Sequence, residues 1–597
     1  MKLKYIWALV GVMGLNTSCN DIIDILPIDS FTDESYWRSV DDLEKYANRF
    51  YTNLGGAGVD GDTQSDNRVT TSYNTWLFNE YLVENASDWD WTNIRNLNFF
   101  MTRYQRVSGT ETDINEQVAK VRFFRALDYF GKIKTYGDVP WYEKDLNTGD
   151  TEELYKDRDP RDYVLQKVIE DLEFAITWLP EREAAEECGL HKDVARTLLS
   201  RVCLYYGTYK KYHNETDGTI SSTDLLQKAV EMCEAIMKTG RYDIVKGSNS
   251  GASMVPDDRY PMDYQNQFVQ ESLEGNKEAI LYRAYVSGVV THNAGRSNGC
   301  GYSKDFAESF LCKDGKPIGL SNLYQGDETL DDEMMNRDPR MYQIIDNIHR
   351  PYTIQSDGTK EYNHAYNDIH ASGPDVSSAG SVTGYANVKW TSANPDQWTA
   401  NAGTFDWFIY RYAEVLLNYV EAKYELGQCT QDVLDKTINK LRDRVDMPHL
   451  TVEVGFVDPN APDYDYKVTP LLNEIRRERR IELVGEGFRY DDIIRWKATK
   501  LFENPKTFLG MRVTDKVIAL YQEGTFGGEK GRALIEYEGK TYIRPYAKSL
   551  NDPGRVWTDD DKRFLSPLSK NVLLINPNLK QNPGWSEQKK TSSIQSH

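Results

Sequence analysis

The sequence has few of the residues that build disulfide frameworks or metal centres. Only seven cysteines occur in 597 residues, with no CxxC spacing and no paired Cys–His pattern, so the usual structural zinc sites are excluded. His364 and His370 do not have the spacing of two metal ligands on a helix. A disulfide between Cys300 and Cys312 is compatible with an oxidising compartment, and the sequence alone leaves this pairing open.

Signs of catalysis and of nucleic-acid binding are scarce as well. The sequence contains no phosphate-binding loop and no recognisable metal pair. A net charge of −21 argues against nucleic acid and anionic membrane surfaces as partners. A glycoside hydrolase needs two suitably spaced carboxylates, and among 92 acidic residues some pair can always be chosen, so this class remains an alternative. We expect a protein that is not an enzyme and has no cofactor.

The first residues have the pattern of a secretory signal peptide. Two lysines precede an apolar stretch over residues 5–15, which is too short to span a bilayer. Cys19 follows small residues, so we expect a signal peptide over residues 1–18 and lipidation of Cys19, which would anchor the mature chain to a membrane. Asp21 and Asp24 then resemble the signal that sends such lipoproteins to the cell surface. The alternative is an ordinary signal peptide followed by an unrelated cysteine.

Behind this segment we expect a single domain over residues 19–597, because no Pro/Gly/Ser linker divides it. Its N-terminal part should extend to about residue 330 and its C-terminal part from about 331. Apolar residues at helical spacing predict helices, and Asp159–Pro160 should open one of them. The predicted helices cover 116–135, 159–180, 191–212, 224–238, 407–426 and 433–443.

The region from 240 to 406 breaks this pattern with Gly, Asn, Ser, Asp and scattered aromatic residues. A long irregular region inside a helical protein is usually functional or mobile. Acidic residues from Asp327 to Asp332 would permit a structural Ca²⁺ ion, and solvated surface charge is the alternative.

The stretch from 473 to 497 is the most informative part of the sequence. Four glutamates recur at every fourth position with arginines around them, and like charges at this spacing repel unless cations lie between them. We expect a partly buried structural ion-pair network rather than an active site. Gly485 and Gly487 should end the helix, since glycine tolerates the left-handed backbone of a C-terminal cap. The predicted network members are Glu474, Glu478, Arg479, Arg480, Glu482, Glu486 and Arg489.

This stretch resembles the late signature of the SusD/RagB family, nutrient-binding lipoproteins on the outer membrane of Bacteroidetes. Blocks at 125–127 with 136–140, at 411–422 and at 576–585 resemble the family in the same order. The resemblance implies a mostly α-helical SusD-like fold, with tetratricopeptide-like hairpins as scaffold and irregular loops carrying the ligand site. It also implies an oligosaccharide as ligand and a TonB-dependent, SusC-like outer-membrane transporter as partner. The RagB branch binds peptides, and this alternative remains open.

Aromatic side chains amid polar residues suit sugar binding, because the rings cover apolar C–H faces while polar neighbours bond the hydroxyl groups. Trp89 and Trp91 would share one face of an extended segment, and family members carry a Trp-x-Trp here that stacks on glucose in the starch binder. Ile94 stands where that binder has a polar contact, which implies a different sugar or none. Packing of both rings on the core is the alternative. The full predicted ligand-binding set is Trp89, Trp91, Asn93, Trp76, Arg68, Tyr302 and Trp390.

Overall fold

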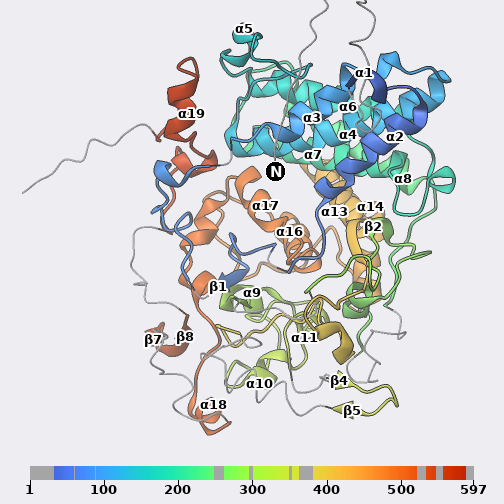
Figure 1. Ribbon diagram of the computed structural model, residues 1–597. Coiled ribbons are helices and arrows are strands. Elements are labelled where there is room, and N and C mark those ends of the chain that lie inside the picture. The colour runs from blue at the N-terminus through green and yellow to red at the C-terminus, as the bar shows by residue number, and fades with distance from the viewer. Residues whose placement is uncertain are drawn as a thin grey trace, which may run out of the picture.

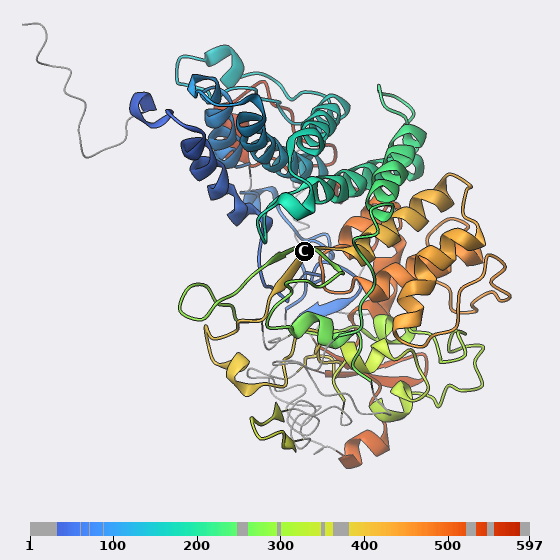
Figure 2. The ribbon, with the colours of Figure 1, turned by 90° about the vertical axis from the view of Figure 1, so that its right-hand side faces the viewer.

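The structure, a computed structural model, describes residues 33–59, 61–70, 72–87, 89–247, 261–294, 300–347, 353–361, 381–520, 533–545 and 555–585. The predicted signal peptide, Cys19 and both histidines considered above lie outside the described residues. Long helices gather at one end of the molecule, while short strands and loops fill the opposite end (Figure 1, Figure 2). The prediction of a mostly helical fold is confirmed.

The helices of the N-terminal half are α1 (Asp33–Tyr36), α2 (Val40–Asn48), α3 (Thr92–Met101), α4 (Glu111–Tyr136), α5 (Thr151–Leu154), α6 (Arg161–Trp178), α7 (Lys192–Tyr212) and α8 (Ser222–Met237). Those that follow are α9 (Lys304–Ser309), α10 (Leu330–Met334), α11 (Arg340–Ile344), α13 (Tyr412–Glu425), α14 (Gln431–Lys436), α15 (Ile438–Arg444), α16 (Pro470–Glu482), α17 (Arg489–Arg495), α18 (Asp515–Leu520) and α19 (Lys570–Ile575).

The strands of the described residues form two-stranded antiparallel sheets. The pairs are β1 (Arg68–Thr70) with β3 (Cys300–Tyr302), β2 (Ala279–Arg283) with β6 (Trp407–Arg411), β4 (Thr353–Ile354) with β5 (Lys360–Glu361), and β7 (Ala533–Tyr537) with β8 (Lys540–Arg544).

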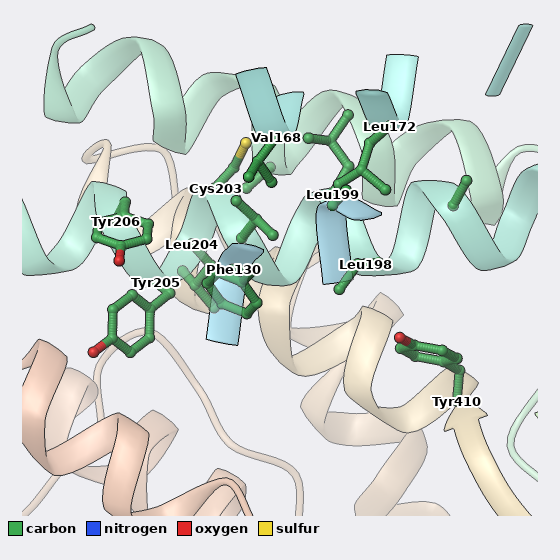
Figure 3. Packing of buried hydrophobic residues seen from close by; sticks show 14 of the residues in the cluster. Phe130, Val168, Leu172, Leu198, Leu199, Cys203, Leu204, Tyr205, Tyr206 and Tyr410 are labelled. Atoms are coloured by element: carbon green, nitrogen blue, oxygen red, sulfur yellow. The ribbon is translucent and has the colours of Figure 1, made fainter. Parts of the chain in front are cut away.

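One hydrophobic core joins the long helices. Phe130 of α4, Val168 and Leu172 of α6, and Leu199 and Tyr206 of α7 interleave there and are almost fully buried (Figure 3). Helix α4 packs chiefly on α6, and α7 on α8, as in helical hairpins. The helices therefore form a continuous scaffold that also supports the segments before α3 and after α19.

Some local predictions are wrong. Residues 407–411 form strand β6, which pairs with the distant β2, and helix α13 begins only at Tyr412. The predicted helix over 433–443 divides into α14 and α15 at Thr437, whose backbone leaves the helical region (φ −127°, ψ −94°). Asp159 does not cap α6, because its carboxylate accepts the backbone N–H of Trp141 at 2.7 Å.

A second core lies in the irregular region. The pairing of β1 with β3 places Arg68 opposite Tyr302 and Thr70 opposite Cys300. No disulfide joins Cys300 to Cys312. Both strands are largely buried, so this part of the molecule has a packed interior of its own.

None of the helices in the described residues combines the length and the apolar composition needed to cross a membrane. Those residues also contain no group of three His, Cys, Asp or Glu side chains that could hold a metal ion. Asp327, in the loop considered for Ca²⁺, accepts from Lys304 at 3.0 Å and from Arg512 at 2.9 Å. Burial raises the pKa of Asp327, but these cations outweigh it and hold the pKa well below its usual range. Both carboxylate oxygens are thus already bonded, which does not fit a calcium ligand.

Helix α16 carries a charge network into the interior. Its Glu482 is fully buried and pairs with Arg444 at 2.6 Å, Arg411 at 2.7 Å and Arg340 at 3.2 Å. Among the described residues the connected cluster contains five cations and five carboxylates, so its net charge is zero. Its members are Arg340, Lys389, Arg411, Arg442 and Arg444 with Glu278, Asp338, Glu478, Glu482 and Glu486.

Neighbouring ion pairs hold the remaining predicted members. Arg489 binds Asp66 through two N···O contacts of 2.7 Å, and Arg480 contacts the same carboxylate at 3.2 Å. Burial alone would raise the pKa of Asp66, but the two guanidinium groups lower it to about 2. Arg479 pairs with Asp492 at 2.9 Å. Glu474 pairs with the arginine three positions later at 3.1 Å.

The end of α16 departs from the prediction in one detail. The helix ends at Glu482, so Glu486 reaches the network from the following loop. Gly485 and Gly487 have φ of 76° and 83° and turn the chain there. A Cβ atom at Gly485 would lie 2.5 Å from the ring of Trp390, so this close approach requires glycine.

Candidate functional site

A groove of about 570 Å³ opens where helix α3 begins. One wall consists of residues 89–92, 94 and 95 together with Tyr142. Leu154 of α5 and residues of α19 and the segment after it also line the groove. In Figure 1, α3, α5 and α19 lie on the helical side of the molecule. The groove is thus built from parts of the chain that are far apart in sequence.

Trp89 and Trp91 are half-buried and do not form one flat platform. Their rings meet edge to face, with centroids 5.3 Å apart and planes at 75°. Trp89 packs on Tyr136 at 5.0 Å and Trp91 on Tyr142 at 5.3 Å, again edge to face. The two rings therefore lie on the same side of the segment, as expected, but do not lie in one plane. The rings pack on the core and also line the groove at an angle to each other.

Polar contacts fix the segment that carries these rings. The Lys132 ammonium lies 4.8 Å from the ring centroid of Trp91 and donates to the backbone oxygen of Asp90. Asp90 accepts from the hydroxyl of Thr92 at 2.6 Å and from its backbone N–H at 2.9 Å, and these bonds lower the pKa of the Asp90 carboxyl. The Nε1–H of Trp91 is buried and has no acceptor among the described residues.

Asn93 is exposed and lines an adjoining hollow of about 430 Å³ with Lys132 and Tyr136. The two hollows share a border, because Tyr136 packs on Trp89 and Lys132 on Trp91. Three predicted ligand-binding residues, Trp89, Trp91 and Asn93, are therefore neighbours at one surface.

Arg68 and Tyr302 lie in the interior instead. The guanidinium carbon of Arg68 is 5.5 Å from the ring centroid of Tyr302, and the Tyr302 hydroxyl donates to Asn387 at 2.6 Å. Both side chains are buried by the pairing of β1 with β3. In this structure neither presents a surface to a ligand, which corrects the expectation for these two residues.

Trp76 and Trp390 belong to stacked aromatic pairs away from the groove. Trp76 lies 5.7 Å from Trp585, and its Nε1–H donates to the hydroxyl of Tyr490 at 2.8 Å. Trp390 is 2% exposed and stacks on Trp407 at 5.2 Å. Neither ring lines the groove that Trp89 and Trp91 form, but Trp390 lines a second hollow, between α4 and β6.

A further hollow of about 390 Å³ lies between α4 and β6. Trp407 and Phe408 line it and are half-buried, and four glycines also border it: Gly55, Gly56, Gly58 and Gly61. Its lining cations are paired: Lys134 with Asp491, and Arg201 with Glu414 at 2.6 Å. This hollow borders the irregular region that was expected to carry the ligand site, whereas the Trp89–Trp91 groove lies outside that region.

Comparison with known proteins identifies the family. The model of the SusD family matches residues 235–585, which is more than half of the chain. The chain belongs to the SusD family. The matched stretch includes β6, the charged helix α16 and α19, and it begins after Trp89 and Trp91.

Relatives within the SusD family are similar over most of their length. SusD-like protein P2 of Formosa agariphila is 22% identical over 540 residues, which cover 83% of this chain and 90% of P2. SusD-like protein P38 of the same organism is 21% identical over 501 residues, covering 81% of this chain and 89% of P38.

Solved structures show the same fold. A SusD-like protein from Bacteroides fragilis superposes with a TM-score of 0.65 at 23% identity and covers 94% of this chain and 100% of its own. A SusD-like carbohydrate binding protein from the same organism gives a TM-score of 0.64 at 21% identity, with coverages of 91% and 100%. The similarity in fold thus extends over more than nine-tenths of this chain.

Sequence reasoning missed one side of the groove in this SusD-family protein. Ile575 of α19 lines the groove and is 69% exposed, and its neighbour Leu574 is 80% exposed. The apolar run Val572–Ile575 near the end of the chain was the available signal, because large exposed apolar side chains often mark binding surfaces. The run is too short to give a periodic pattern of its own.

Proposed function

We propose that this SusD-family chain is a cell-surface protein that captures an oligosaccharide at the Trp89–Trp91 groove. The observation that supports this is the groove itself, which has two indole rings in its wall. Its volume of about 570 Å³ lies within the usual range of ligand pockets, about 300–1,000 Å³. Indole rings offer rigid apolar faces to the C–H surfaces of a sugar, and they lose little conformational freedom when they bind.

Capture without cleavage is part of the proposal. Among the described residues that line the groove, Asp90 is the one carboxylate. Hydrolysis of a glycosidic bond ordinarily uses two carboxyl groups on either side of the scissile bond. The low pKa of Asp90 also makes it a poor general acid at neutral pH. These features favour a binding site over a hydrolytic one.

We further propose that Cys19 carries the lipid anchor and that a TonB-dependent, SusC-like outer-membrane transporter receives the ligand. The family membership and the apolar segment before Cys19 support this role. A lipid-anchored protein could hold its groove above the transporter and concentrate the glycan there, since two or more acyl chains give stable attachment.

The test is a glycan array followed by isothermal titration calorimetry of the best ligand. The double variant Trp89→Ala/Trp91→Ala should lose at least about tenfold in affinity, because the contact area of both rings is removed. Trp178→Ala is the matched control: Trp178 is half-buried on α6 and packs on Phe174, and it lines neither the groove nor the neighbouring hollows. Equal affinities of all three proteins would remove the groove from the binding site.

A further inference from the structure

Several polar groups that line the Trp89–Trp91 groove are already bonded within the protein. The Asn98 amide nitrogen donates to the backbone oxygen of Tyr142 at 2.7 Å, and its oxygen accepts from Arg125 at 3.2 Å. The Asn576 side chain donates to the oxygen of Lys156 at 3.0 Å and accepts a backbone N–H at 3.0 Å. These amides have little capacity left for the hydroxyl groups of a sugar.

Two cationic side chains, Arg95 and Lys144, line the groove, and Lys144 already has a partner. Lys144 donates to Asp150 at 2.8 Å. The exposed guanidinium of Arg95 has no side-chain partner among the described residues, and the Nε1–H of Trp91 has no acceptor there. The bonds of Asp90 to Thr92 use Oδ1 and leave Oδ2 out. The groove thus offers donors and an acceptor along the start of α3, and the exposed side chains of Asn147 and Thr148 line it as well.

Aliphatic side chains occupy much of the rest of the groove. Ile94 is buried beneath it, and Leu154 and Ile575 line it with 37% and 69% of their surface exposed. Val572 and Leu579 add further apolar surface. A plain hexose would press hydroxyl groups against these side chains without hydrogen bonds, which is unfavourable.

We infer that the groove is selective for an N-acetylated amino sugar, an inference that rests on the proposed function. An acetamido group combines a methyl group, a carbonyl acceptor and an N–H donor. The methyl group would contact Leu154 and Ile575, the carbonyl would accept from Arg95, and the N–H would donate to Asp90. This one substituent uses Arg95, Asp90 and the aliphatic wall together.

The charges in the groove favour a neutral N-acetylated sugar over an acidic sugar. An anionic substituent would pair with Arg95 but would also approach the carboxylate of Asp90, which the Thr92 bonds keep ionised. A neutral acetamido group satisfies both side chains without repulsion. The neutral ligand is therefore the better match.

The test compares two disaccharides with the same β-1,4-linked skeleton. N,N′-diacetylchitobiose carries acetamido groups where cellobiose carries hydroxyl groups. Calorimetry of the full mature chain should give at least about tenfold tighter binding of the acetylated sugar, from one buried methyl group and its added hydrogen bonds. Arg95→Gln and Ile575→Ser should each reduce that preference several-fold.

Leu574→Ser is the matched control, because Leu574 is exposed on the same helix but does not line the groove. It should keep the wild-type preference. Equal binding of the two disaccharides, or tighter binding of an acidic disaccharide, would overturn the inference while leaving glycan capture intact. Absence of binding to every glycan on the array would instead refute the proposed function, and this inference with it.

Discussion

Removal of a single negative charge from the buried network should destabilise the whole fold. The variant Glu482→Gln keeps the size of the side chain and removes its charge. Three guanidinium groups, those of Arg340, Arg411 and Arg444, lie within 3.2 Å of the Glu482 carboxylate. They come from helices α11 and α15 and from strand β6, so the change affects the junction between the helical scaffold and the irregular region.

The magnitude follows from the balance of charges. The cluster of five cations and five carboxylates is neutral, and Glu482→Gln leaves it with one unpaired positive charge in the interior. Breaking a buried ion pair costs about 3–5 kcal/mol because the remaining charge stays desolvated. The amide NH₂ of glutamine is a donor and would face guanidinium donors. Glutamine therefore cannot accept all of the hydrogen bonds that the Glu482 carboxylate accepts.

Denaturant unfolding followed by tryptophan fluorescence would measure this loss. Asp432→Asn is the matched control, because Asp432 is 68% exposed and pairs with Lys436 at 2.6 Å on a helix surface. A surface pair of this kind contributes about 0.3–0.5 kcal/mol. The reasoning is refuted if Glu482→Gln shifts the unfolding midpoint no more than Asp432→Asn does.

Three further changes test other parts of the account. Cys19→Ala should abolish incorporation of a fatty-acid probe, and continued labelling would rule out the anchor. Burial lowers the pKa of His191 and His213 from 6.5 to about 4, so stability should fall as pH decreases from about 6.5 to about 4, by on the order of 2–3 kcal/mol for each histidine; a flat melting temperature across that window would contradict this. Gly485→Ala should lower stability by at least about 1 kcal/mol more than Gly427→Ala, because both glycines have positive φ but only Gly485 also meets a ring at 2.5 Å; equal melting temperatures would show that the ring moves freely.

Local patterns in the sequence predicted the long helices well. The apolar repeat over 159–180 became α6 and that over 191–212 became α7, because each buries one apolar face against its neighbours in sequence. The run at 407–411 was misread, since its pairing with β2 depends on a contact between distant parts of the chain. The break at Thr437 has no Gly or Pro to announce it.

The site was predictable only in part, for the same reason. Trp89 and Trp91 stand two residues apart among polar neighbours, a pattern that local reasoning can recognise. Their mutual angle depends on Tyr136 and Tyr142, and the second wall of the groove comes from α19 near the end of the chain. The residues around Tyr302 in the sequence are typical of a loop, yet Tyr302 is buried because β3 pairs with β1.

The most direct test of the central claim measures binding and turnover in the same sample. The wild-type chain and its Trp89→Ala/Trp91→Ala variant are titrated with the best array ligand, and the glycan is then recovered and its length determined by mass spectrometry. We predict saturable binding by the wild type, at least about tenfold weaker binding by a variant with an unchanged melting temperature, and glycan of unaltered length. Wild-type affinity in the variant, or shortened glycan, would contradict the account.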